Sequence, residues 1–225
     1  MFRLEDIERA RRIVSVLDLP ADIGEDDEIE GIMESQLEGA GINGDYYVTS
    51  GISKAVIVIE NLPFVIKTPF SGYWGDFEED GCDVPFYHFS EANEIFPDDY
   101  CFDELQKTQR VEEEGFGMFV PHMEFLCESN GRPFYIQGKA RQAIDSRNKM
   151  NPSGDSMQKA QNYFLPFANE WIALAIDLYG EALWNKFIQW ATIDEPDILT
   201  DMHGANYGLD MNGRPVMFDI SGFRD

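Results

Sequence analysis

Cysteine, histidine and basic residues are all scarce in this sequence of 225 residues. Its three cysteines and three histidines are scattered, with no spacing typical of paired metal ligands, so we expect reduced thiols and no transition-metal site. No apolar run approaches the length of a membrane span, and the first twenty residues lack the apolar core of a signal peptide. These absences argue against a disulfide scaffold, a zinc module, a membrane protein and a secreted protein. They predict a cytoplasmic protein.

Acidic residues dominate the charge of the chain. The 17 Lys and Arg residues face 42 Asp and Glu residues, which gives a net charge of −25 and a sequence pI near 4.2. A field of this sign repels nucleic acid and anionic membranes, so we expect neither as a direct partner. Two interpretations of the acidity remain open. It forms a solvated surface that maintains solubility, or it imitates a polyanion and occupies a nucleic-acid-binding protein.

Residues 1–44 are expected to form an acidic, helical N-terminal extension. Apolar residues recur at helical spacing from Phe2 to Leu17, and a second helix is expected from Asp27 to about Leu37. Acidic residues precede this second helix, where they suit the positive end of the helix dipole. Nothing in the extension resembles a catalytic site.

Residues 45–140 have the pattern of an antiparallel sheet with one helix. Strand-forming residues are bounded by turn residues, and the pair Asn130-Gly131 is a strong hairpin signal. We expect a helix from about residue 98 to 114 and an irregular insertion at 68–97, with a short helix at 90–95. The expected strands are 46–49, 55–59, 64–67, 123–127 and 133–136.

Residues 141–225 are expected to be mainly helical. A polar linker at 145–154 begins this part, and apolar residues at helical spacing predict helices at 160–179 and 181–191. The Trp and Met residues of this part of the chain are interpreted as core residues.

The final stretch of the sequence carries the clearest candidate site. Asp201, Asn206 and Asp219 offer hard oxygen donors, which are the ligands that Mg²⁺ prefers. Between the last two, an apolar run, the two-residue turn pair Asn212-Gly213 and a β-rich run predict a hairpin. Such a hairpin would bring Asn206 and Asp219 side by side. The stretch therefore predicts a magnesium and phosphate site.

A second group of candidate residues lies on the expected sheet. The small-residue turn from Ser50 to Lys54 has backbone N–H groups suited to a phosphate, although an ordinary hairpin loop is the alternative. Lys67 closes an apolar strand, where a lysine either reaches solvent or meets an anion. A lysine one strand after such a turn is placed to meet the phosphates of a nucleotide. Glu104 or Asp103 on the following helix can pair with it, and a solvent-facing acid is the alternative.

The stretch Asp201-Met202-His203-Gly204-Ala205-Asn206 is similar to the Asp-Leu-His-x-x-Asn catalytic loop of aminoglycoside and choline phosphotransferases. With the strand lysine and the acid-bearing helix before it, the sequence resembles the protein-kinase-like superfamily over about residues 45 to 223. It looks most like the host-takeover serine/threonine kinases of short-tailed bacteriophages. This resemblance implies an α+β fold with a small antiparallel-sheet N-lobe, a reduced and mainly helical C-lobe, and an N-terminal helical extension.

The resemblance also implies a role for each candidate residue. Asp201 would be the catalytic base and Glu104 the partner of Lys67, while His203 would support the loop. Gly51, Ser53 and Lys67 would bind ATP, and Asn206 and Asp219 would hold Mg²⁺.

The sequence departs from the family pattern at three points. Asp219-Ile220-Ser221-Gly222 replaces the usual Asp-Phe-Gly, and the turn over the nucleotide has only Gly51. The given sequence also ends at Asp225, without the activation segment and helical subdomain of the family pattern, so we expect a protein substrate to be recognised by another surface, or the active fold to need a partner.

Three functions follow from these observations. The first is a Mg-ATP-dependent kinase acting on serine or threonine of host proteins in the host cytoplasm, with basic or nucleic-acid-binding proteins favoured by the acidity. The second is a pseudokinase or an acidic, polyanion-mimicking protein that binds and inhibits a host nucleic-acid enzyme. The third is a small-molecule phosphotransferase, suggested by the catalytic loop.

Overall fold

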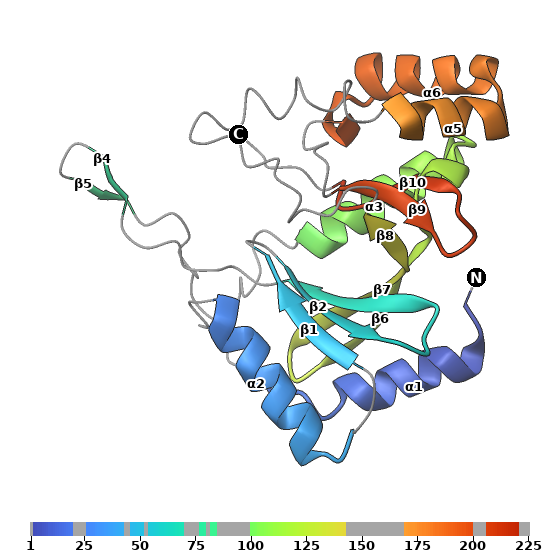
Figure 1. Ribbon diagram of the computed structural model, residues 1–225. Helices are drawn as coiled ribbons and strands as arrows, with labels where there is room; N and C mark the ends of the chain where they lie inside the picture. The colour runs from blue at the N-terminus through green and yellow to red at the C-terminus, as the bar shows by residue number, and fades with distance from the viewer. Residues whose placement is uncertain are drawn as a thin grey trace. The chain divides into compact units, whose positions relative to one another are not determined.

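Two compact units make up the chain, the first of residues 1–102 and 124–137 and the second of residues 103–123 and 138–225. Figure 1 labels the helices and strands of both. The computed structural model describes residues 2–19, 26–42, 46–51, 54–69, 77–79, 82–84, 100–142, 169–199 and 206–220.

The first unit is built on an antiparallel sheet of five strands in the order β1-β2-β3-β7-β6. Short turns join β1, β2 and β3 as consecutive neighbours, and the hairpin of β6 and β7 returns beside β3. Most of these segments are rich in β-branched and aromatic residues, which favour strands. The five strands expected from the sequence are thus confirmed. They are β1 (Tyr46–Ser50), β2 (Lys54–Ile59), β3 (Phe64–Pro69), β6 (Met123–Ser129) and β7 (Arg132–Gly138).

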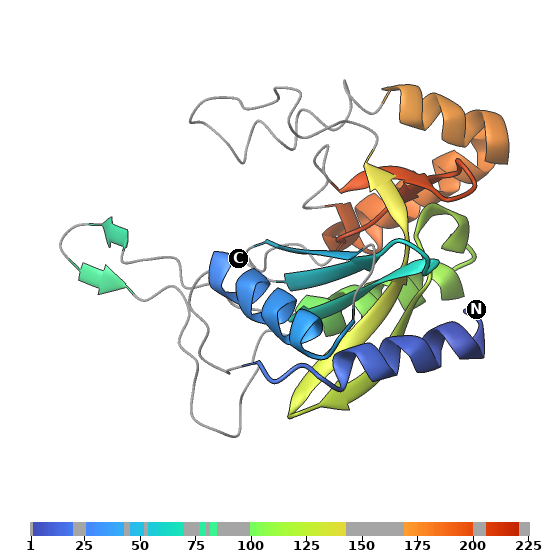
Figure 2. The same ribbon diagram turned by 60° about the horizontal axis from the view of Figure 1, so that its bottom comes forward.

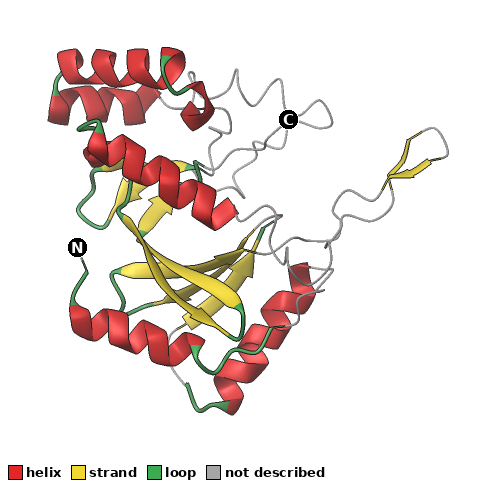
Figure 3. Ribbon diagram, turned by 180° about the vertical axis from the view of Figure 1, so that it is seen from behind, coloured by secondary structure: helices red, strands yellow, loops and turns green. Residues whose placement is uncertain are grey.

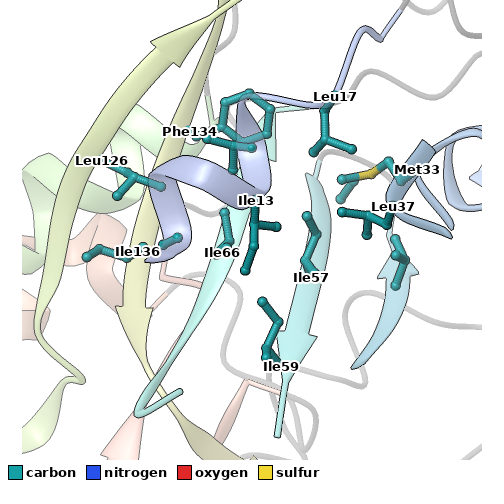
Figure 4. Packing of buried hydrophobic residues seen from close by; sticks show 14 of the residues in the cluster. Ile13, Leu17, Met33, Leu37, Ile57, Ile59, Ile66, Leu126, Phe134 and Ile136 are labelled. Carbon is teal, nitrogen blue, oxygen red and sulfur yellow. The ribbon is translucent and has the colours of Figure 1, made fainter. Parts of the chain in front are cut away.

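Two helices, α1 (Leu4–Val14) and α2 (Asp26–Gly39), cover one face of this sheet (Figure 2). Both were expected from the apolar spacing of residues 2–17 and 27–37. Acidic residues in the first turn of α1 and basic residues in its last turn complement the helix dipole. Figure 4 shows the core between helices and sheet, which includes Ile13, Leu17, Met33, Leu37, Ile57, Ile66 and Phe134.

The turn between β6 and β7 follows the local chemistry of Asn130-Gly131. Both residues have positive φ, 51° at Asn130 and 76° at Gly131, as a two-residue turn of this kind requires. The Asn130 side-chain amide also donates to the carbonyl of Leu17 at 2.7 Å. This bond ties the turn to the segment that follows α1.

Within residues 68–97, where an irregular insertion was expected, the described residues form regular strands. Thr68 and Pro69 complete β3, and β4 (Phe77–Glu79) pairs with β5 (Cys82–Val84) in an antiparallel hairpin. The expectation was wrong for these residues because three-residue strands are too short to show a period in the sequence. The short helix expected at 90–95 lies outside the described residues.

The second unit combines helices with a three-stranded sheet in the order β10-β9-β8. Helices α5 and α6, which correspond to the two expected helices, lie side by side (Figure 3). The residues expected to form the linker at 145–154, and those expected to begin the first helix at 160–168, lie outside the described ranges. The elements are α3 (Tyr100–Glu113), η1 (Gly117–Phe119), β8 (Ala140–Gln142), α5 (Asn169–Tyr179), α6 (Glu181–Ile193), η2 (Pro196–Leu199), β9 (Tyr207–Asp210) and β10 (Pro215–Met217).

Aromatic side chains fill the core of this second unit. Phe119 stacks on Phe187 with ring centroids 4.5 Å apart, and Trp171 meets Trp184 edge to face at 5.8 Å. The Trp171 indole N–H donates to the carbonyl of Gly208, which joins α5 to β9 at 2.8 Å. These tryptophans are core residues, as interpreted from the sequence. Across the described ranges, every helix is too short or too polar to cross a lipid bilayer.

Candidate functional site

The hairpin of β9 and β10 carries two of the expected site residues. Met217 lies opposite Tyr207, and the next residue, Phe218, donates its backbone N–H to the carbonyl of Asn206 at 2.8 Å. Asn206 therefore directly precedes β9, and Asp219 follows the residue paired with Asn206. The expected hairpin is confirmed, and it brings the backbones of Asn206 and Asp219 close together.

The turn of this hairpin has three residues, and the expected two-residue turn was wrong. Asp210 donates its N–H to the carbonyl of Arg214 at 2.8 Å, which leaves Met211, Asn212 and Gly213 as the loop. Gly213 has a φ of 76°, as the last residue of such a three-residue loop requires. The Asp210 carboxylate accepts the N–H groups of Asn212 and Arg214 at 2.8 and 2.9 Å, and these bonds favour the longer loop.

An ion pair reinforces the same turn. The Arg214 guanidinium lies against the Asp210 carboxylate, with Nε at 2.7 Å and Nη2 at 2.6 Å from Oδ2. Burial alone would raise the pKa of Asp210, but the hydrogen bonds from Arg214 and Asn212 outweigh it and hold that pKa below its ordinary value. The hairpin that positions Asn206 and Asp219 is therefore fixed at its far end by charge.

Asp219 has an unusual backbone and a buried acidic partner. Its φ is 58°, in the left-handed region that few residues other than glycine adopt. Its N–H donates to Oε1 of Glu104 at 2.8 Å, and Glu104 is fully buried. Glu104, Asn206 and Asp219 thus come together within the second unit from distant parts of the chain. A non-glycine residue in the left-handed region that is held by a buried side chain is a feature found at functional sites.

The position of Glu104 follows from the phase of α3. The buried residues of this helix recur at helical spacing, and Glu104 belongs to that stripe. Thr108 lies one turn further on the same face, and its buried hydroxyl has no hydrogen-bond partner within the described part of the chain. The buried stripe consists of Cys101, Glu104, Leu105, Thr108 and Val111.

Two other acids of α3, Asp103 and Glu112, are bonded within the second unit. Asp103 forms an ion pair with Lys107 one turn along α3, at 3.2 Å. Glu112 lies 2.7 Å from Nδ1 of His122. Among the three acids, Glu104 is the one that is fully buried and bonded to Asp219.

Lys67 lies in the first unit, on the third strand of the sheet as expected, and only 6% of its surface is exposed. Its direct partner across the ladder is Val56 on β2. Neighbouring residues of a strand face opposite sides, so Lys67 lies on the sheet face opposite to Ile66 and the helix-covered core. The pairing of Lys67 with Glu104 stays a prediction.

The residues that border the turn between β1 and β2 are bonded within the protein. Gly51 donates its N–H to the carbonyl of Lys54 at 2.9 Å. Ser50 donates both its N–H and its hydroxyl to one carboxylate oxygen of Glu30, at 2.5 and 2.7 Å. The N–H groups of Ser50 and Gly51 and the Ser50 hydroxyl are therefore already hydrogen-bonded within the protein. A phosphate at this turn would have to bind to other donors. The ATP-binding role of Gly51 stays a prediction.

Two of the expected site residues lie in parts of the chain that the structure does not describe. Asp201, the expected catalytic base, and Ser53, expected to bind ATP, lie outside the described residues, as does His203. Their roles stay predictions.

The hairpin carries residue types that Mg²⁺ prefers, and the magnesium site stays a prediction. Within the described ranges, no three His, Cys, Asp or Glu side chains form a group that could hold a metal. Mg²⁺ at phosphate-transfer sites usually takes one or two protein carboxylates and completes its shell with phosphates and water. One amide oxygen from Asn206 and one carboxylate from Asp219 match that demand.

Lys54 is a candidate residue that the sequence analysis did not single out. It begins β2, and only 5% of its surface is exposed. Its sequence signal is a lysine that directly follows the small-residue turn and opens an apolar strand.

Comparisons with models of known protein families, with curated proteins and with solved structures found no match.

Proposed function

We propose that this chain is a Mg-ATP-dependent kinase of the bacteriophage host-takeover type, which phosphorylates serine or threonine of host proteins. The bond from Asp219 to buried Glu104, beside the Asn206 hairpin, carries the proposal. In protein kinases an Asn and an Asp hold the metal, and a lysine on the third strand pairs with a helix glutamate. The chain offers these residue types on an α+β framework, in the same order.

Each residue then has a separate task. When bound, ATP supplies the phosphoryl group and Mg²⁺ neutralises the charge of its phosphates. Asn206 and Asp219 would supply oxygen ligands, and Glu104 would hold the backbone of Asp219 in place. Lys67 would place its ammonium against the phosphates. Asp201 would accept the proton of the substrate hydroxyl as it attacks.

Nucleotide binding with and without Mg²⁺ tests the site. Wild type should bind ATP more tightly with Mg²⁺, and Asp219→Ala should abolish this difference. Asp177→Ala is the matched control, since it removes an exposed carboxylate of α5 in the same unit. A metal-independent affinity in wild type would contradict the proposal.

Phosphate transfer tests the activity itself. Labelling of host proteins from γ-labelled ATP should disappear in Asp201→Ala. Undiminished labelling in that variant would reject Asp201 as the base. A screen of alcohols and aminoglycosides in the same assay tests the small-molecule phosphotransferase, which requires ATP turnover with one of them.

The net charge of −25 favours a second function, an acidic protein that occupies a basic host protein. Such a complex should weaken with salt, because it rests on charge, and it should survive Asp201→Ala and Asp219→Ala. A complex that those substitutions abolish would contradict it.

A further inference from the structure

Two described hairpins carry the same four residues at their tips, Asn-Gly-Arg-Pro, at 130–133 and at 212–215. Asn130-Gly131 forms the turn between β6 and β7, and Asn212-Gly213 belongs to the loop between β9 and β10. Asparagine before glycine is open to an intramolecular reaction, because a glycine nitrogen can reach the side-chain amide carbon without hindrance from a Cβ. The two pairs share their local sequence, so a difference between them in the folded chain comes from their surroundings. A third pair, Asn43-Gly44, lies outside the described residues.

The reaction is a deamidation, and water is its only co-reactant. The glycine nitrogen attacks Cγ of the asparagine, the bond from Cγ to Nδ2 breaks, and the proton of the glycine N–H leaves with Nδ2 as ammonia. Water then opens the five-membered succinimide ring at either of its carbonyls, which gives aspartate or isoaspartate. The net change consumes one water, releases one ammonia and replaces a neutral amide with a carboxylate.

The side chain of Asn130 is held by a bond into the protein. Its Nδ2 donates to the carbonyl of Leu17 at 2.7 Å, and Leu17 is only 1% exposed. To reach the Gly131 nitrogen, the amide carbon has to leave the position in which Nδ2 meets this carbonyl. The attack therefore breaks the bond and leaves a carbonyl of a buried residue without its donor.

The side chain of Asn212 lies at an exposed loop tip. Its Nδ2 is 3.5 Å from Oδ2 of Asp210, at the limit of a hydrogen bond, and both Asn212 and Gly213 are exposed. A Cβ added at Gly213 would meet no atom within 4 Å, so the space beside its nitrogen is open. The Gly213 N–H donates to the carbonyl of Asp210 at 3.0 Å, and this bond has to open for the attack. Water replaces such a bond at an exposed tip, so its loss costs less than the loss of the bond to Leu17.

We propose that Asn212-Gly213 is a deamidation site of the folded protein, whereas the bond to Leu17 protects Asn130-Gly131 as long as the chain is folded. Neither a nucleotide nor a metal takes part, so the outcome does not depend on the kinase proposal. In the unfolded chain the protecting bond is absent, and the two pairs should react alike.

Deamidation at position 212 changes the loop that closes the β9–β10 hairpin. The new carboxylate lies beside the carboxylate of Asp210, and like charges at this distance repel. Isoaspartate also adds one backbone carbon to a loop of three residues. Converted protein, separated by ion exchange through its added charge, should therefore unfold at a lower urea concentration than unconverted protein. Equal unfolding midpoints would overturn this consequence.

Peptide mapping by mass spectrometry tests the site on the wild-type chain. Folded protein and protein unfolded in urea are incubated side by side at mildly alkaline pH, and the converted fraction of each asparagine is followed with time. In urea the two Asn-Gly-Arg-Pro segments should react at similar rates. In the folded chain Asn130 should react more slowly than Asn212 by about fivefold or more, because its attack leaves the Leu17 carbonyl without a donor. Asn185, exposed on α6 and followed by Lys186, is the control and should stay intact in the folded chain.

The comparison has two outcomes that would overturn the proposal. One is a reaction at Asn130 in the folded chain that is as fast as the reaction at Asn212. The other is an Asn212 that stays intact in the folded chain over the time in which it is converted in urea. Conversion of Asn212 ahead of Asn130 in the folded chain, with similar rates in urea, supports it.

Discussion

Two neutral replacements of Glu104 should separate its hydrogen bond from its charge. Glu104 is fully buried, and its Oε1 accepts the N–H of Asp219 at 2.8 Å. Glu104→Gln keeps an oxygen for this bond, whereas Glu104→Met has similar length and no acceptor. Both variants lack the carboxylate, so their difference reports the loss of the side-chain oxygen acceptor.

The magnitude follows from the burial of the donor. A buried N–H left without an acceptor costs about 1–3 kcal/mol, so Glu104→Met should be less stable than Glu104→Gln by that amount. The left-handed backbone of Asp219, at φ 58°, costs a non-glycine residue about 1–2 kcal/mol, somewhat less for Asp. Without the bond, Asp219 is free to leave this conformation. A loss of about 1.4 kcal/mol in metal binding lowers Mg-dependent ATP affinity tenfold.

Urea unfolding followed by tryptophan fluorescence measures the stability difference, because Trp171, Trp184 and Trp190 lie in the core of the second unit. Calorimetry with ATP, with and without Mg²⁺, measures the effect on the site. Asp103→Asn is the control, since that neighbouring acid pairs with Lys107 instead. Equal unfolding midpoints and equal Mg-dependent affinities for the two Glu104 variants would refute the reasoning.

Three further predictions concern the scaffold. The pKa of Asp210 is depressed in the folded state, so the carboxylate stabilises the fold above its unfolded pKa of about 4, and this stabilisation is lost as pH falls through the lower folded pKa. The free energy of unfolding in urea, measured between about pH 3 and 7, should therefore depend less on pH in Asp210→Asn than in wild type. Parallel curves for the two proteins would contradict this. Gly213→Ala should lower the free energy of unfolding by about 1 kcal/mol because φ is 76° at this position, although a Cβ there would meet nothing within 4 Å. Gly31→Ala, inside α2, should raise the free energy of unfolding by about 0.5–1 kcal/mol. Thermal unfolding should show these opposite signs, and equal signs would count against a conformational cause. Phe187→Ala should lower the free energy of unfolding in urea by about 3–5 kcal/mol, because the Phe187 ring is fully buried against Phe119. Leu178 is half exposed, so a loss in Phe187→Ala no larger than that in Leu178→Ala would be inconsistent with this packing.

Local chemistry explains the parts of the fold that the sequence predicted well. Asn130-Gly131 can adopt the two positive φ angles of its turn, and α1 and α2 bury apolar residues at helical spacing. The same local logic predicted that Asn206 and Asp219 would lie side by side, because a single hairpin joins them. The turn pair Asn212-Gly213 predicted a two-residue loop, whereas the loop has three residues. The difference arises because the Asp210 carboxylate accepts the N–H groups of Asn212 and Arg214, which favours the longer loop.

Long-range contacts explain what the sequence did not predict. The residues Ala140-Arg141-Gln142 have no strand preference of their own, and they form β8 because they pair with β9, where Ala140 faces Asp210. The bond between Glu104 and Asp219 spans 115 residues, and no local pattern signals it. The burial of Glu104 was predictable in principle, because Glu104 and not Asp103 falls on the buried face of α3, whereas its pairing with Lys67 stays a prediction.

The Glu30 carboxylate that holds Ser50 also affects how the sheet meets other chains. Among the described strands, β1 lies at the edge of the five-stranded sheet, and such edges offer N–H groups on which a foreign strand can add. Ser50 ends that edge, and its N–H is already bonded to a charged acceptor. An incoming strand would have to displace this bond and place its own carbonyl beside a carboxylate. Glu30 therefore protects this end of the sheet against edge-to-edge aggregation.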